Sequence, residues 1–170
     1  MKKLLACTAL AMASSLMVMA QNKADLRFSI GPELDFATGT FSNTHSVGIG
    51  ATVQAEKFIQ QNLYGTGTIG IVIFNGKSIG GTNVKFTGQT IIPLKIGVKY
   101  FLAGGLYGAA QIGAGFLSNF AKGTAFAYTP QLGYEFQTKT GRAADIAIKY
   151  DGYSKNGTIG ALGLRVAYIF

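Results

Sequence analysis

Apolar and polar residues alternate with a period of two almost continuously from residue 27 to the C-terminus, and no other feature constrains the fold as strongly. Successive side chains of a β-strand point to opposite faces, so this period indicates strands rather than helices. The alternating segments are about ten residues long, which is typical of strands that span a membrane. Eight strands are predicted, near residues 27–36, 46–56, 63–74, 84–100, 106–117, 125–137, 143–151 and 158–170.

Turn residues separate these segments and support an antiparallel order. Asn75-Gly76, Gly104-Gly105, Thr140-Gly141 and Asn156-Gly157 favour the positive φ angles that tight hairpins need. An even number of strands returns both termini to one end, and eight is the smallest closed barrel of this type. We therefore predict an all-β fold, an eight-stranded antiparallel transmembrane up-and-down β-barrel. Because a proline removes a ladder donor, we expect a bulge or local irregularity near Pro32, Pro93 and Pro130.

The charged residues indicate which face of the barrel is polar. When apolar residues alone set the register, every charge within a strand falls opposite the apolar face. These residues are Arg27, Glu33, Asp35, Glu56, Lys85, Lys95, Lys99, Glu135, Asp145, Lys149, Asp151 and Arg165. A face rich in Phe and Tyr is too bulky for an eight-stranded interior, and 13% charged residues is too few for a soluble barrel surface. We therefore predict lipid outside and polar side chains in the lumen.

Most tyrosines lie near strand ends, where an aromatic girdle is expected at each membrane interface. The residues predicted to form it are Tyr64, Tyr100, Tyr107, Tyr128, Tyr134, Tyr150 and Tyr168.

The first twenty residues have the organisation of a signal peptide. Met1-Lys2-Lys3 is a positive n-region, residues 4–17 are mostly apolar, and Val18-Met19-Ala20 ends in the small-residue pattern of a signal-peptidase site. We predict that residues 1–20 are cleaved and that residues 21–170 form one barrel domain. Cleavage would remove Cys7, the one cysteine, so no disulfide is expected. Residues 21–170 contain no apolar run of 18 residues, which a transmembrane helix would need.

Short motifs in the second half of the chain carry a resemblance. Ile92-Pro93-Leu94-Lys95 leads to Lys99-Tyr100-Phe101, and a glycine-rich segment over 104–115 precedes Gly133-Tyr134-Glu135. Together they resemble the outer-membrane protein β-barrel domain family that is common in Bacteroidota. The resemblance implies a small porin-like or OmpX-like barrel in the outer membrane of a Gram-negative bacterium. It also implies that Tyr168 and Phe170 belong to the assembly signal that the barrel-assembly machinery recognises.

The motifs that could carry catalysis or bind a cofactor are weak. His45 is the one histidine, and the neighbouring Ser46 points to the opposite face of the strand, which is poor geometry for a catalytic pair. Residues 65–70 match the dinucleotide pattern G-x-G-x-x-G, but alternation continues through Ile73 and no helix follows. Gly76-Lys77-Ser78 is predicted to be a hairpin tip. We expect no enzymatic activity, cofactor, metal site or nucleic-acid partner.

The candidate site is a network of charges inside the barrel. Glu33, Lys95, Lys149 and Arg165 fall near the mid-height of their strands. The first and last strands meet at the closing seam, so we predict an ion pair between Glu33 and Arg165. A buried charge without a partner costs several kcal/mol, so these groups are expected to pair or to be hydrated. A packed lumen would indicate a structural or interaction role, and the alternative is a narrow porin-like channel for ions or small solutes.

The predicted loops define the outer surface. Residues near 37–45, 75–83, 118–124 and 152–157 are predicted to face outward, and turns near 57–62, 101–105 and 138–142 to face the periplasm. Lys77, Lys122 and Lys155 lie in three of the four outward loops, where they would attract lipopolysaccharide phosphates. The expected partners are therefore outer-membrane lipid and lipopolysaccharide, and the protein is expected to be a monomer.

Overall fold

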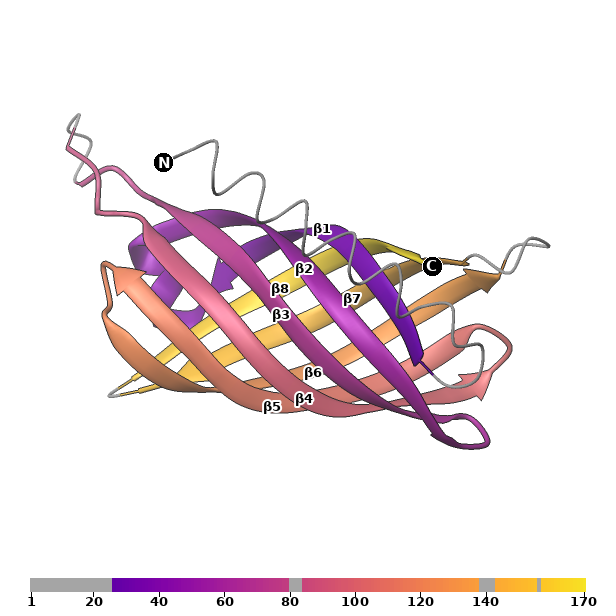
Figure 1. The fold of residues 1–170 in the computed structure, drawn as a ribbon. Coiled ribbons are helices and arrows are strands. Elements are labelled where there is room, and N and C mark those ends of the chain that lie inside the picture. Colours follow the sequence, from indigo (N-terminus) through magenta and orange to yellow (C-terminus); the bar gives the residue numbers. More distant parts are fainter. Residues whose placement is uncertain (1–25, 80–83, 138–142, 156) are drawn as a thin grey trace, which may run out of the picture.

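The computed structural model describes residues 26–79, 84–137, 143–155 and 157–170, so the predicted signal peptide lies outside the described residues. Eight antiparallel strands form a closed barrel in which neighbours in sequence pair and β1 pairs with β8 (Figure 1). The strands are β1 (Leu26–Thr38), β2 (His45–Gln60), β3 (Leu63–Gly76), β4 (Gln89–Ala103), β5 (Leu106–Asn119), β6 (Gly123–Gln137), β7 (Ala143–Ser154) and β8 (Thr158–Ile169). The predicted fold class is confirmed.

Helical structure is confined to η1 (Gly39–Asn43), a short 3-10 helix after β1, in the part of the chain that is described. No helix among these residues has the length and apolar character needed to cross a membrane.

The two ends of the barrel carry different connections. Leu26 and Phe170, the first and last described residues, lie at one end, where the backbone N–H of Phe170 donates to the carbonyl of Phe28 at 2.9 Å. We call this the terminus end, and it also holds the turns after β2 and β4. The opposite end, which we call the loop end, holds η1 and the connections after β3, β5 and β7 (Figure 1). The turn predicted at 138–142 lies outside the described residues.

Each of the three prolines lies at a gap in one ladder of the sheet. Pairing stops at the proline and resumes in the same register beyond it, toward β8 for Pro32, toward β3 for Pro93 and toward β7 for Pro130. On its other side each proline stays paired in register with the neighbouring strand. A proline has no backbone N–H, so each gap matches the donor that is missing. The expected irregularity is confirmed, and it is a ladder gap rather than a bulge.

The fourth strand begins later than the alternation predicts. β4 starts at Gln89 rather than at Val84, because β5 ends at Asn119, directly opposite Gln89, and offers no partner beyond it. Lys85 makes only an isolated bridge to Ser78 and is exposed. The prediction that Lys85 faces the lumen is therefore wrong, since it belongs to a loop.

The outer wall of the barrel is apolar and the lumen is polar. Ile96 and Ile49 are 68% and 62% exposed on the outside, whereas Lys95 and Asp35 are 2% and 1% exposed inside. A continuous apolar wall around a closed barrel is stable in a bilayer, where closure leaves no backbone group without a partner. The predicted apolar exterior and charged lumen are confirmed.

Two of the tyrosines predicted for the girdle point into the barrel instead. Tyr107 is 1% exposed, and its hydroxyl accepts a hydrogen bond from Gln131 in the lumen at 2.9 Å. The ring of Tyr64 lies 4.7 Å from the guanidinium carbon of Arg27. Tyr100, Tyr134 and Tyr168 are exposed on the outer wall as expected.

Candidate functional site in the barrel lumen

All four charges predicted for the lumen are buried inside the barrel, and they belong to two separate clusters. The mid-lumen cluster consists of Glu33 and Asp35 from β1, Lys95 from β4, and Lys149 and Asp151 from β7. The basal cluster lies nearer the terminus end and consists of Arg27, Glu56, Lys99, Glu135, Asp145 and Arg165. Period-two alternation places these residues inside, because each occupies a lumen-facing position of its strand.

Lys149 is the centre of the mid-lumen cluster. Its ammonium donates to Glu33 Oε2 at 2.9 Å and to Asp151 Oδ2 at 2.5 Å, and it lies 3.6 Å from Asp35 Oδ1. Lys95 donates to the other oxygen of Asp151 at 2.7 Å and to Thr129 Oγ1 at 2.9 Å. Asp151 is thus bound by two cations, while Asp35 has none within hydrogen-bond distance.

The basal cluster is balanced in charge, since three cations face three carboxylates. Lys99 donates to Glu56 and to Glu135 at 3.0 Å each, and Arg27 binds the same two carboxylates from the side of the terminus end. Arg165 donates to Asp145 Oδ1 at 3.3 Å. Arg27 has a 29% exposed side chain, so it lies where the cluster meets the terminus end.

The predicted ion pair between Glu33 and Arg165 is wrong, although the two residues are direct partners in the β1–β8 register. Glu33 binds Lys149, whereas Arg165 donates from Nε to Thr52 Oγ1 at 2.8 Å and from Nη2 to Ser29 Oγ at 2.9 Å. A long guanidinium side chain reaches partners well away from its own Cα position. Arg165 therefore extends toward the terminus end, and Glu33 pairs with Lys149 instead.

A layer of amides and hydroxyls lies next to the basal cluster. Gln111 donates to Thr66, Thr68 and Gln54 at 2.9–3.2 Å. Gln54 in turn donates to Glu56 Oε1 at 2.8 Å, which joins this amide layer to the basal cluster. Networks whose members are satisfied hold their side chains in one arrangement. The layer therefore fills the lumen with fixed polar groups rather than with mobile ones.

An apolar plug fills the lumen at the loop end. It is formed by Phe41 from η1 with inward-facing residues of the strands, namely Val72, Phe74, Ile91, Leu117, Ala125, Ala127, Tyr153 and Ala161. Phe41 is 5% exposed, and its ring centroid lies 5.1 Å from that of Phe74 in an edge-on contact. The alternation could not reveal this plug, because Phe41 sits in a loop where no period applies.

His45 also contributes to this plug. Its ring is fully buried and stacks on Phe41 at a centroid distance of 4.4 Å. Nδ1 lies 2.8 Å from Thr44 Oγ1, and Nε2 lies 3.1 Å from the carbonyl oxygen of Thr87. Burial at this position, beyond the apolar belt of the wall, lowers the pKa of His45. The neutral ring therefore fastens β2 to the segment that precedes β4.

Glycines on the lumen face make room for the large inward side chains. A Cβ at Gly133 would collide with the Tyr107 ring, and one at Gly163 would collide with Asp35 and Lys149. These two glycines therefore provide space for large side chains inside a narrow barrel.

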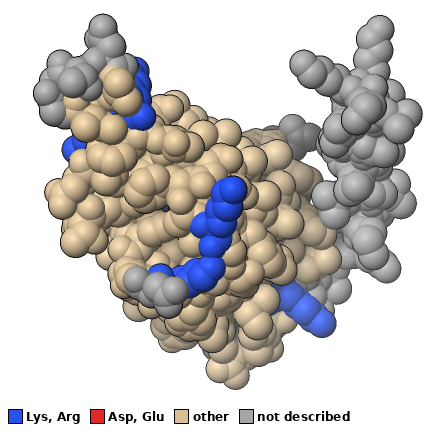
Figure 2. Space-filling model, turned by 90° about the vertical axis from the view of Figure 1, so that its left-hand side faces the viewer, with Lys and Arg blue, Asp and Glu red and all other residues tan. Residues whose placement is uncertain are grey.

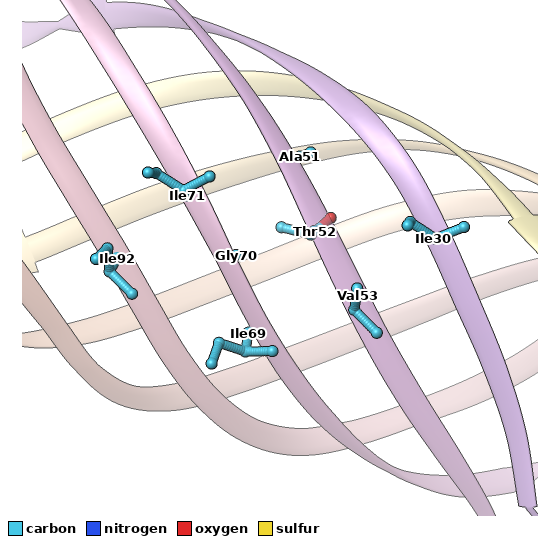
Figure 3. Close-up of a pocket in the computed structure, with 8 residues that line it drawn as sticks. All are labelled: Ile30, Ala51, Thr52, Val53, Ile69, Gly70, Ile71 and Ile92. Atoms are coloured by element: carbon cyan, nitrogen blue, oxygen red, sulfur yellow. The ribbon is translucent and has the colours of Figure 1, made fainter. Parts of the chain in front are cut away.

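The dinucleotide-like segment at 65–70 lies within β3, which continues as a strand to Gly76. Gly70 lines a shallow depression of about 250 Å³ on the outer wall, together with Ile30, Ala51, Thr52, Val53, Ile69, Ile71 and Ile92 (Figure 3). This depression holds no titratable group. Among the described residues, no group of three or more His, Cys, Asp or Glu side chains could hold a metal ion.

The loop end presents basic residues. Lys77, Lys85, Lys122 and Lys155 are exposed there, and the view onto this end shows lysine without any acidic residue (Figure 2). Lys77 donates to the carbonyl of Ser42 and Lys155 to that of Lys122, each at 2.6 Å. Every acidic residue of the described chain is buried in the lumen clusters, so the loop end has a uniformly positive surface.

No protein-family model and no curated protein sequence matches the chain. Solved structures with the same fold include surface and outer-membrane proteins of bacteria. Neisserial surface protein A has a TM-score of 0.59 at 10% identity, over 86% of this chain and 96% of that one. Ail of Yersinia pestis, in complex with the heparin analogue sucrose octasulfate, has a TM-score of 0.55 at 12% identity, over 86% and 98%. OprG of Pseudomonas aeruginosa has a TM-score of 0.56 at 11% identity, over 86% and 95%.

Proposed function

We propose that this protein is a structural or interaction barrel of the outer membrane whose lumen is closed to solutes. The observation that carries the proposal is the succession of buried side-chain groups in the lumen of the described barrel. The basal cluster, the amide layer, the mid-lumen cluster and the apolar plug follow one another along the axis. Their side chains are buried and bound to one another, so a solute would have to break ion pairs at two levels. The outer-membrane barrels with the same fold support this location.

Single-channel conductance of the mature chain in a planar bilayer tests the closed lumen. We expect insertion without discrete openings. The assay is calibrated with a variant in which Phe41, Lys149 and Arg165 are all replaced by alanine, since each substitution removes bulk from a different level. Stable openings of the unmodified barrel would overturn the proposal in favour of a narrow channel.

A catalytic role has little support from the geometry. Both ring nitrogens of His45 are occupied by Thr44 and Thr87, and its ring is enclosed by Phe41 and Phe120. A general base needs a free nitrogen within reach of the proton that it removes. We propose that the protein acts without catalysis and that it works as a monomer.

We further propose that the loop end contacts the phosphates of lipopolysaccharide. Four exposed lysines lie there without a neighbouring carboxylate, and opposite charge favours such contacts at a membrane surface. The complex of Ail with a sulfated heparin analogue is consistent with anion binding by a barrel of this fold. The orientation in which the loop end faces outward is part of this proposal.

Lipopolysaccharide retention by purified protein tests the partner. The variant carries Lys77→Gln, Lys85→Gln, Lys122→Gln and Lys155→Gln, and its control carries Lys57→Gln at the terminus end. We expect reduced retention in the first variant and unchanged retention in the control. Equal retention in all three proteins would refute the contact with lipopolysaccharide phosphates.

A further inference from the structure

The mid-lumen cluster carries one carboxylate too many. Lys95 and Lys149 face Glu33, Asp35 and Asp151, and the basal cluster has no spare cation because its own charges balance. An uncompensated charge away from water is costly, and proteins neutralise such groups. The excess negative charge therefore requires a counter-charge inside the barrel.

The excess is located at Asp35. Its side chain is 1% exposed, and neither of its oxygens has a hydrogen-bond donor in the described chain. The nearest cation, Lys149 Nζ, lies 3.6 Å from Oδ1 and already donates to Glu33 and Asp151. Asp151, by contrast, accepts from two ammonium groups and from Thr129.

A second unsatisfied oxygen lies beside it. Glu33 Oε1 is buried and has no hydrogen-bond partner, and Glu33 lies two residues from Asp35 on the same face of β1. The lumen is narrow here, because a Cβ atom at Gly163 of β8 would collide with Asp35 and Lys149. The two carboxylates thus carry three buried oxygens without a hydrogen-bond donor on one face of β1, which we call the Glu33–Asp35 corner.

We propose that the Glu33–Asp35 corner is a binding site for a single positive charge, either a proton or an alkali metal ion. The described residues provide no set of three or more donors of the kind that holds a multivalent metal ion, and the neighbouring Lys149 would repel a divalent one. One added charge neutralises the cluster. A proton on Asp35 would also supply a donor to an oxygen that lacks one.

The other groups that act on Asp35 are identified. They are Glu33 on its own strand, Lys149 and Asp151 on β7, and Lys95 on β4. Tyr153 of the plug lies close enough to interact with Asp35 electrostatically. Because Lys95 and Lys149 donate their hydrogen bonds to Asp151 and Glu33, Asp35 is the carboxylate of this cluster whose neutralisation costs no hydrogen bond.

The test compares Asp35→Asn with Asp151→Asn in the refolded full mature barrel, by urea unfolding followed by far-ultraviolet circular dichroism. The asparagine at 35 removes the excess charge with little change of shape, so we expect an equal or higher unfolding midpoint. The asparagine at 151 leaves two ammonium groups short of a partner, so we expect a clearly lower midpoint. Asp35→Asn that is as destabilising as Asp151→Asn would overturn the proposal.

Two further series of unfolding measurements on the unmodified barrel, one against pH and one against sodium concentration, identify the ligand. If the site holds a proton, the unfolding equilibrium constant rises by up to about tenfold per pH unit across the range in which only the folded state keeps it. If it holds an alkali ion, that constant falls by up to about tenfold for each tenfold increase in sodium, with choline keeping ionic strength constant. Asp35→Asn should abolish whichever dependence occurs. A response to neither variable, or one that survives in Asp35→Asn, would refute the site.

Infrared spectroscopy of barrel labelled with ¹³C-aspartate provides a readout that needs no variant to fold. A protonated carboxyl band at neutral pH identifies the proton, and a carboxylate band that shifts with sodium identifies the metal ion. A carboxylate spectrum that responds to neither would count against the proposal. Because this site lies in the lumen, its failure would leave the closed-barrel proposal and the lipopolysaccharide contact unaffected.

Discussion

Glu33 and Arg165 face each other directly across the β1–β8 seam, yet their side chains belong to different charge clusters. Glu33 is bound to Lys149 at 2.9 Å, and Arg165 extends to Asp145, Ser29 and Thr52. The closing seam is therefore held by the backbone ladder and by two independent networks, rather than by one ion pair that bridges it.

This separation predicts the result of two double-mutant cycles. Glu33→Gln combined with Lys149→Met should show a coupling energy of about 1–3 kcal/mol, because the two residues share a direct ion pair. Glu33→Gln combined with Arg165→Met should be additive within about 0.5 kcal/mol. Urea unfolding measures both cycles. Strong coupling in the second cycle would mean that the seam pair forms after all.

Lys149→Met should be among the most destabilising lumen substitutions. The ammonium binds Glu33 and Asp151 and is the nearest cation to Asp35, so its removal leaves buried carboxylates without a partner. Breaking a buried network in this way costs about 3–5 kcal/mol. The matched control, Lys57→Met, changes an exposed lysine and should stay within about 0.5 kcal/mol. A small effect at Lys149 would indicate that water replaces the ammonium at little cost.

The barrel could be predicted from the sequence because the alternation of side chains between two faces is a local property of each strand. Alternation assigns each side chain to a face, and the charges at positions such as Lys95 and Asp151 then identify the lumen without any knowledge of packing. Tyr107 is predicted to lie in the girdle for a different reason, since a tyrosine near a strand end is usually interfacial. Its inward position depends on Gly133, which makes room for the ring from the neighbouring strand.

The pairing inside the lumen could not be predicted from register. Arg165 reaches past Glu33 because its long side chain extends to Ser29, Thr52 and Asp145, and the direction in which a long side chain extends is not visible in alternation. The plug escaped prediction for another reason. Phe41 and the fully buried His45 meet through a turn of 3-10 helix whose residues follow no period. Contacts that depend on loop geometry leave no mark in the alternation.

Gly133→Ala should destabilise the barrel, because its added methyl group would collide with the buried Tyr107 ring. Overpacking of this kind costs about 1–3 kcal/mol. Gly108→Ala is the control, since it lies next to Tyr107 in sequence and a Cβ there meets open space. Thermal unfolding monitored by circular dichroism compares the two. Equal midpoints would show that Tyr107 moves aside freely.

Stability should fall in mildly acidic solution because of His45. Burial lowers its pKa below the ordinary value of 6.5, so the unfolded chain takes up a proton that the folded plug excludes. The contribution of the neutral His45 ring to the free energy of unfolding is fully present above pH 6.5 and is lost as pH falls through the folded-state pKa. The free energy of unfolding changes by at most about 1.4 kcal/mol per pH unit in this range. The difference between the unmodified barrel and His45→Gln isolates this effect. An unchanged difference across that range would show that the ring titrates normally.

Phe41→Ala tests whether the apolar plug or the charge clusters keep the lumen closed. Truncating this buried ring removes its contacts with His45 and Phe74, at a cost of about 3–5 kcal/mol if the site does not collapse. The clusters around Lys149 and Lys99 would stay in place below it, because neither contacts Phe41 in the hydrogen-bond and ion-pair networks described. We therefore expect a less stable barrel that still inserts and remains silent in single-channel recordings. Discrete openings in Phe41→Ala, absent from the unmodified barrel, would mean that the plug alone holds the lumen closed. Ions would then pass between the charged side chains, and η1 would be the gate.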